Sequence, residues 1–118
     1  MYEVKIIEAS RDLSKKETYK VTDFTGNLKL DKELSEGTEI RIDVDYYVKC
    51  EVNNDDGENY NVIVVVDKDG KRYSTGSSSF MNSFDRIVDV MDGEDFAVIA
   101  FKRESKKSGK TYICCTLE

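Results

Sequence analysis

Five cationic side chains and two aromatic residues are concentrated in one short segment near the end of the sequence. Residues 101–112 read FKRESKKSGKTY and carry a net charge of +4, because the only negative side chain among them is Glu104. The whole chain of 118 residues has a net charge of −6, so the remaining residues carry −10. Cationic groups beside aromatic rings can hold phosphates and stack nucleobases. The candidate binding residues in this segment are Phe101, Lys102, Arg103, Lys106, Lys107, Lys110 and Tyr112.

The same segment is also typical of a solvent-exposed hairpin. Residues 105–110 surround Gly109 and predict a tight turn between two strands, at 95–103 and 111–117. Lysines at such a turn prevent a sheet edge from pairing with other molecules. The sequence alone leaves both interpretations open.

Three residues from the middle of the sequence join the candidate set. Tyr60 begins an apolar, β-branched stretch that is typical of a central strand. Arg72 and Tyr73 follow a hairpin turn predicted at 68–70 by its Asp-Gly pair. An exposed tyrosine stacks a base with about 1–3 kcal/mol, and a nearby arginine can hold a phosphate. The alternative is structural, because tyrosine favours half-buried strand positions in any β protein.

Alternating apolar residues predict a mainly β chain. The clearest strand covers 38–48, where every second residue is apolar and Tyr47 falls on the opposite, wet face. Two further strands are expected at 60–66 and 71–75, on either side of the turn at 68–70.

One helix is expected after these strands. A serine among 77–79 can cap its start, and Asp92-Gly93 can end it. Its apolar face is formed by Phe80, Phe84, Ile87, Val88 and Met91, which share one side of a helix.

The order of these elements indicates the fold. After residue 37 the expected order is three strands, one helix and two strands. This is the order of an OB-fold, a five-stranded barrel with a helix between strands 3 and 4. Layouts of the β-grasp and SH3 type share parts of this order. The first 37 residues add strands at 2–8 and 18–23, while 27–34 suits either a short strand or a helical turn. We expect a single domain over 1–118, with an N-terminal strand extension at 1–37 and an OB-like barrel core at 38–118.

Composition argues against several classes of function. The chain has no histidine, the commonest general base and metal ligand, so we expect no enzyme, no metal site and no cofactor. Cys50, Cys114 and Cys115 have no CxxC spacing, and we expect them to be reduced thiols packed as small hydrophobic groups. No apolar run reaches about 18 residues and the start is unlike a signal peptide, so we expect a cytoplasmic protein without a membrane span.

Two motifs give the sequence a family resemblance. A Y-x-T-x-S-x-x-F run leads into the expected helix, and a K-x-x-S-K-x-x-G-x-x-Y run crosses the last hairpin. Over 67–118 the chain resembles small single-stranded-DNA-binding proteins of bacteriophages and prophages of Gram-positive bacteria. The resemblance implies an OB-fold that coats single strands during replication or recombination in a bacterial cell. The residues that match are Tyr73, Thr75, Ser77 and Phe80, then Lys102, Ser105, Lys106, Gly109 and Tyr112.

The expected partners follow from this resemblance. Single-stranded DNA is the expected ligand, and the sequence does not distinguish it from RNA. Replication or recombination proteins are further expected partners. The sequence leaves open whether the chain forms a homo-oligomer. Many bacterial single-strand binders end in an acidic tail that recruits partners, whereas this sequence stops at Glu118 directly after its last expected strand. Either such a tail is absent, or recruitment uses another acidic surface, such as residues 53–59.

The acidic residues also support an alternative function. A chain with a net charge of −6 suits an acidic protein-binding or inhibitory module that acts on a host DNA-processing protein. The carboxylates that would serve it are Asp43, Asp45, Asp55, Asp56 and Glu58.

Overall fold

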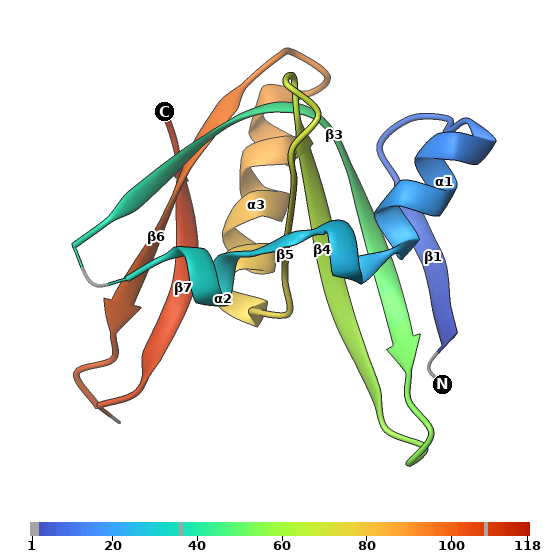
Figure 1. Ribbon diagram of the computed structural model, residues 1–118. Helices are drawn as coiled ribbons and strands as arrows, with labels where there is room; N and C mark the ends of the chain where they lie inside the picture. Colours follow the sequence, from blue (N-terminus) through green and yellow to red (C-terminus); the bar gives the residue numbers. More distant parts are fainter. Residues whose placement is uncertain (1–2, 36, 108) are drawn as a thin grey trace.

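The computed structural model describes residues 3–35, 37–107 and 109–118. Within these residues the chain is mainly β, as predicted, and a seven-stranded sheet curls into a half-barrel around one long helix (Figure 1). The elements in chain order are β1 (Glu3–Ala9), α1 (Lys15–Thr22), the 3-10 helix η1 (Phe24–Gly26), β2 (Leu28–Lys29), α2 (Leu30–Glu33), β3 (Glu39–Asn53), β4 (Asn59–Asp67), β5 (Arg72–Thr75), α3 (Ser78–Met91), β6 (Ala97–Glu104) and β7 (Thr111–Leu117).

β3 is the strand on which the rest of the sheet is built. Its first part, from Glu39 to Asp43, pairs antiparallel with β6, and its later part pairs with β4 on one side and β1 on the other. The register with β4 shifts between Val44 and Tyr46, and such a bulge bends a strand and increases its twist. A single strand therefore belongs to both walls of the half-barrel (Figure 1).

The same bulge changes which face of β3 looks toward α3. Before it, Val44 belongs to the core cluster around α3; after it, Tyr46 and Val48 belong to a second cluster on the opposite face, together with Val21 of α1. Tyr47 consequently faces α3, where it is 8% exposed and its ring centroid lies 5.1 Å from that of Phe84. The prediction of a wet face for Tyr47 is wrong, because strict alternation does not allow for the extra residue of a bulge.

α3 lies in the opening of the half-barrel, against β7. The Ser77 hydroxyl, just before α3, donates a hydrogen bond to the carbonyl oxygen of Ile113 at 2.7 Å, and the Cys115 thiol donates to the carbonyl oxygen of Phe80 at 3.8 Å. The other end of the sheet is completed by β2, which pairs in parallel with β5. In the part of the chain that the structure describes, β5 and β7 do not pair with each other, and α3 packs where they would meet.

The predicted helix is confirmed as α3. Ser77 is its N-cap, because the hydroxyl oxygen accepts a hydrogen bond from the Phe80 N–H at 3.2 Å. Asp92 at φ 48° and Gly93 at φ 88° end the helix in the left-handed conformation. Phe80 and Phe84 are fully buried on its apolar face. None of the helices in the described residues is long and apolar enough to cross a membrane.

Residues 15–22 form a helix where the sequence predicts a strand at 18–23. Ser14 and Glu17 form a capping box at its start: the Ser14 hydroxyl accepts from the Glu17 N–H at 3.1 Å, and the Glu17 carboxylate accepts from the Ser14 N–H at 2.9 Å. Val21, a residue of this helix, is fully buried. The strand prediction is wrong. The capping box favours a helix, and this segment has one buried position rather than the alternating buried positions of a strand.

The other two N-terminal predictions are met in part. β1 covers most of the strand predicted at 2–8, and Tyr2 lies outside the described residues. The ambiguous stretch 27–34 contains both alternatives, since β2 is followed at once by the short helix α2. α2 buries Leu30 completely in the core cluster around α3, which fixes this segment to the barrel.

Candidate nucleic-acid interface

The basic hairpin, residues 101–112, carries seven of the ten predicted binding residues on the joined ends of β6 and β7. A backbone hydrogen bond from the Ser105 N–H to the Lys110 carbonyl oxygen, 2.8 Å long, closes the turn. Lys106 and Lys107 are exposed at its tip. The hairpin projects from one side of the half-barrel (Figure 1), and four of its cationic side chains are exposed: Arg103, Lys106, Lys107 and Lys110.

Arg103 and Phe101 form one unit beside this turn. The guanidinium carbon of Arg103 lies 4.6 Å from the centroid of the Phe101 ring, a cation–π contact. Tyr112 is directly opposite Arg103 in the β6–β7 register, and both aromatic residues are half-buried. The two aromatic rings predicted to stack bases are therefore brought beside cationic groups that can hold phosphates.

Lys102 extends toward α2. Its ammonium nitrogen lies 3.5 Å from the carbonyl oxygen of Asp31 and 3.4 Å from that of Leu34. Carbonyl groups at the end of a helix lack partners within the helix, so Lys102 compensates for them and ties α2 to β6. Lys102 thus has a structural role in addition to the predicted contact with phosphate.

A cleft of about 650 Å³ opens beside Lys102, and we call it the α3 cleft. Ser78 and Ser79 line it from the first turn of α3, where backbone N–H groups have no partner within the helix. Lys102 adds a full positive charge to the positive end of the helix dipole, while Asp31 opposes them with one negative charge. The remaining lining residues are Gly76, Ser77, Thr111, Tyr112 and Ile113.

Arg72 and Tyr73 are placed differently from the prediction. Tyr73 is 7% exposed in the core cluster around α3, so its ring offers no face to a base, and burial raises the pKa of its hydroxyl. Arg72 donates hydrogen bonds from Nε to the Asn27 side-chain oxygen at 3.0 Å and from Nη2 to the Gly26 carbonyl oxygen at 3.2 Å. Both residues stabilise the fold in this structure and do not join the basic hairpin.

Tyr60 is 49% exposed at the start of β4, across the opening from the basic hairpin. It borders a groove of about 500 Å³ between α3 and the strands β1, β3 and β4, which we call the α3–β4 groove. This groove and the α3 cleft share Gly76 and Ser78. The other lining residues are Ile7, Lys49, Cys50, Asn61, Val62, Met81, Asn82 and Asp85.

An ion pair spans the α3–β4 groove. The Lys49 ammonium lies 2.6 Å from a carboxylate oxygen of Asp85 and 3.6 Å from one of Glu8. Burial acts against the charge of Lys49, but the hydrogen bond to Asp85 and both carboxylates outweigh it and raise the pKa. The groove could not be predicted from the sequence, because its walls come from four elements and no local pattern signals how they pack.

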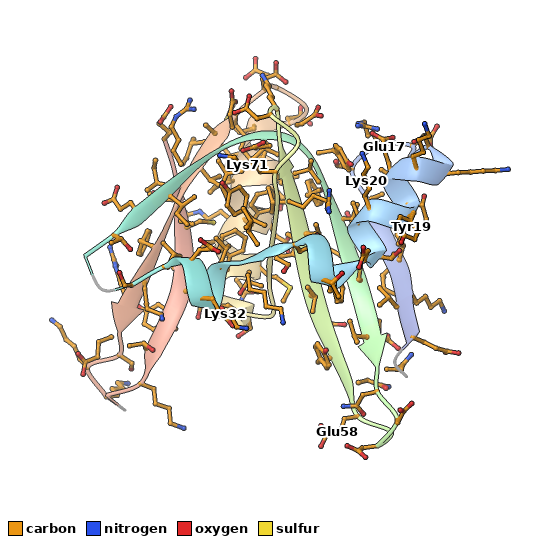
Figure 2. All side chains as sticks on the ribbon, viewed as in Figure 1. Glu17, Tyr19, Lys20, Lys32, Glu58 and Lys71 are labelled. Carbon is orange, nitrogen blue, oxygen red and sulfur yellow. The ribbon has the colours of Figure 1, made fainter. Side chains whose placement is uncertain are left out.

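The acidic hairpin, residues 53–59, stands on the opposite side of the opening from the basic hairpin (Figure 1). The Asn54 side-chain oxygen shapes its turn by accepting hydrogen bonds from the N–H groups of Asp56 at 3.1 Å and Glu58 at 3.0 Å. Both carboxylates are exposed, and Figure 2 shows Glu58 at the tip. The two projecting hairpins therefore carry opposite charges.

The three cysteines are free thiols. Burial raises the pKa of Cys50 to about 11 and that of Cys115 to about 12, so neither forms the reactive thiolate at neutral pH. Across 3–35, 37–107 and 109–118, no group of three or more His, Cys, Asp or Glu side chains is arranged to hold a metal ion.

Comparisons of the chain with models of protein families, with curated proteins and with solved structures found no match. The residues themselves therefore carry the functional conclusion. Two features bear on it: the basic hairpin beside the α3 cleft, and the α3–β4 groove that meets this cleft at Gly76 and Ser78.

Proposed function

We propose that this chain binds single-stranded DNA through the basic hairpin and the α3 cleft. The observation that carries the proposal is that five cationic and two aromatic side chains gather on one projecting hairpin whose base opens into a cleft at a helix N-terminus. A single strand presents phosphates and unstacked bases together, and this surface has groups for both. A duplex hides the faces of its bases and offers this surface only its phosphates.

The order of the elements supports an OB-type barrel for the chain from β3 onward. Three strands precede α3 and two follow it, and β3 pairs with both β4 and β6. OB-folds bind oligonucleotides with the loops that join strands 1–2 and 4–5. In this chain those loops would be the acidic hairpin and the basic hairpin, and only the second has the charge to hold phosphates.

The proposed contacts divide into two kinds. Lys106, Lys107 and Arg103 hold phosphates and release counterions, so binding weakens steeply as salt increases. Phe101 and Tyr112 stack bases, which accepts any base and gives little sequence specificity. The resemblance over 67–118 favours a role in phage or prophage replication or recombination, in the cytoplasm of a bacterial cell.

The test is a fluorescence-anisotropy titration of a labelled single strand of about thirty bases, long enough for several OB-type sites. Affinity is measured over a series of salt concentrations, beside a duplex of equal length. We expect the single strand to bind more tightly than the duplex. The double variant Lys106→Ala, Lys107→Ala should reduce the log–log salt slope by about 0.7 for each phosphate that is no longer neutralised.

A matched control removes two charges elsewhere. Lys15 and Lys16 are adjacent exposed lysines on α1, on the other side of the molecule from the basic hairpin (Figure 1). Lys15→Ala, Lys16→Ala should leave the salt slope unchanged. Equal losses of affinity in both variants would mean that binding follows overall charge, and absence of binding at low salt would overturn the proposal.

The acidic hairpin supports a second candidate, a module that binds a host DNA-processing protein. Asp56 and Glu58 are exposed on a well-formed turn and resemble the charge of nucleic acid. Pull-down from a bacterial lysate with the wild type and with Asp56→Lys, Glu58→Lys separates the candidates. The second candidate is favoured if the wild type retains a DNA-processing enzyme that this variant does not retain, and if the wild type does not bind DNA.

A further inference from the structure

The α3–β4 groove has the size and surface of a ligand site. Its volume of about 500 Å³ falls within the range of about 300–1,000 Å³ typical of small-molecule sites. Ile7 is 57% exposed at the groove, and Met81 and Val62 add apolar surface. Such sites are mostly apolar and contain a few polar groups that orient the ligand.

Two amides, Asn61 and Asn82, are among the polar groups of this groove that remain available, together with the hydroxyls of Tyr60 and Ser78. Neither Asn61 nor Asn82 makes a side-chain hydrogen bond with any residue that the structure describes, whereas Lys49 and Asp85 are already paired with each other. A primary amide offers a donor and an acceptor side by side. The edge of a nucleobase has the same alternation of donors and acceptors.

The groove adjoins the α3 cleft. Gly76 and Ser78 line both spaces, so the two meet at the start of α3. Gly76 has no side chain at this junction, and a Cβ placed there would lie 3.4 Å from the carbonyl oxygen of Asn61. A DNA strand whose phosphates lie in the α3 cleft can therefore place a neighbouring base in the α3–β4 groove.

We propose that the α3–β4 groove is a base-recognition pocket, in which one unpaired nucleobase is hydrogen-bonded by Asn61 and Asn82 and packed against Met81 and Ile7. The proposal rests on the proposed binding of single-stranded DNA and adds a base preference at one position of the strand. The sulfur of Met81 suits contact with an aromatic ring. Elsewhere along the strand, binding remains independent of sequence.

The first experiment compares homopolymers. Anisotropy titrations with oligo-dT, oligo-dC and oligo-dA of equal length should show one base preferred by about tenfold or more, the discrimination expected from one well-placed pair of hydrogen bonds. Asn82→Ala and Asn61→Ala should each reduce that preference at least several-fold. The salt slope should stay as in the wild type, because no phosphate contact is changed.

The matched control is Asn59→Ala. Asn59 is an exposed amide on the same strand as Asn61, two residues earlier, and it does not line the groove. It should leave both affinity and base preference unchanged. Equal affinity for all three homopolymers, or a preference that survives in Asn82→Ala, overturns the pocket while the salt-dependent binding stands; no binding to any oligonucleotide overturns the proposed function itself.

Gly76→Ala tests the passage between the two spaces. Gly76 does not adopt positive φ, so a methyl group there introduces no backbone strain and removes freedom from the unfolded chain. We expect the midpoint of urea unfolding to stay the same or rise, while the base preference falls as in Asn82→Ala. An unchanged base preference in a stable Gly76→Ala variant would show that the bound DNA strand does not cross this junction.

Discussion

Glu17 takes part in two interactions at the start of α1, where Figure 2 labels it. Its carboxylate accepts hydrogen bonds from the Arg11 guanidinium, at 2.6 Å and 3.1 Å, and from the Ser14 N–H at 2.9 Å. These contacts, that with Arg11 above all, lower the pKa of Glu17 from 4.5 to about 2. The charged form therefore holds the first turn of α1 in place.

A pH dependence of α1 follows. The pKa of Glu17 is lower in the folded chain, so its contribution is complete above about pH 4.5 and is lost as pH falls toward 2. A titration of the Glu17 side-chain carboxyl by NMR should give a pKa near 2, and Arg11→Gln should raise it toward 4.5. A value that does not move in Arg11→Gln would show that the ion pair does not hold this carboxylate in solution.

At the level of single residues, the sequence correctly predicted a hairpin turn with exposed lysines, whereas its prediction of an accessible ring is wrong for Tyr73. Charge density and a glycine turn are local signals, so Lys106 and Lys107 could be placed at an exposed tip. Tyr73 could not be assigned to the core, because β5 has only four residues and no alternation that marks its inner face. Asn61 and Asn82 carry no local signal at all, since their shared groove exists only once α3 has packed against β4.

Among the elements, α3 was predicted with both of its ends and α1 was missed. α3 has five apolar residues on one face, a capping serine and an Asp-Gly stop, so several independent signals agree. α1 has one buried residue, Val21, and only the Ser14–Glu17 capping box signals a helix. The bulge in β3 could not be predicted because bulges respond to the pairing of distant strands rather than to local sequence.

Ser77 connects α3 with β7, and removing its hydroxyl should weaken the contacts with both elements. Its hydroxyl oxygen caps α3 at Phe80 and its proton goes to the Ile113 carbonyl in β7. Ser77→Ala should lower the free energy of unfolding by about 1–2 kcal/mol, as for other helix caps. The measurement is urea unfolding beside Ser79→Ala, a half-buried serine of the same first turn that makes no side-chain hydrogen bond with the described residues. Equal destabilisation by both variants would contradict this assignment.

At the scale of the whole molecule, charge is segregated between two hairpins on either side of the opening (Figure 1). A DNA strand held by the basic hairpin, as proposed above, would be repelled by the acidic hairpin over a distance set by salt. The screening length is about 30 Å at 0.01 M salt and about 8 Å at 0.15 M. The acidic hairpin should therefore limit how far bound DNA extends, and mainly at low salt.

Neutralising the acidic hairpin tests this effect. Asp56→Asn, Glu58→Gln should increase affinity for a single strand at low salt by about two- to fivefold, on the order of 0.5–1 kcal/mol, and by less at physiological salt. The control is Asp89→Asn, Glu94→Gln, which makes the same charge change near the far end of α3. The same increase in the control would mean that net charge, rather than the position of the acidic hairpin, governs affinity.

The shared strand β3 has a consequence for how the chain reaches its native state. The hairpins β3–β4, β4–β5 and β6–β7 connect residues close in sequence, but β3 also pairs Asn53 with Glu3 and Glu39 with Phe101. The complete half-barrel depends on these distant pairings, and chains with such topology fold in roughly milliseconds to seconds rather than microseconds. We therefore expect the three local hairpins to form early and unstably, and the barrel to become committed to folding only when β3 pairs with β6.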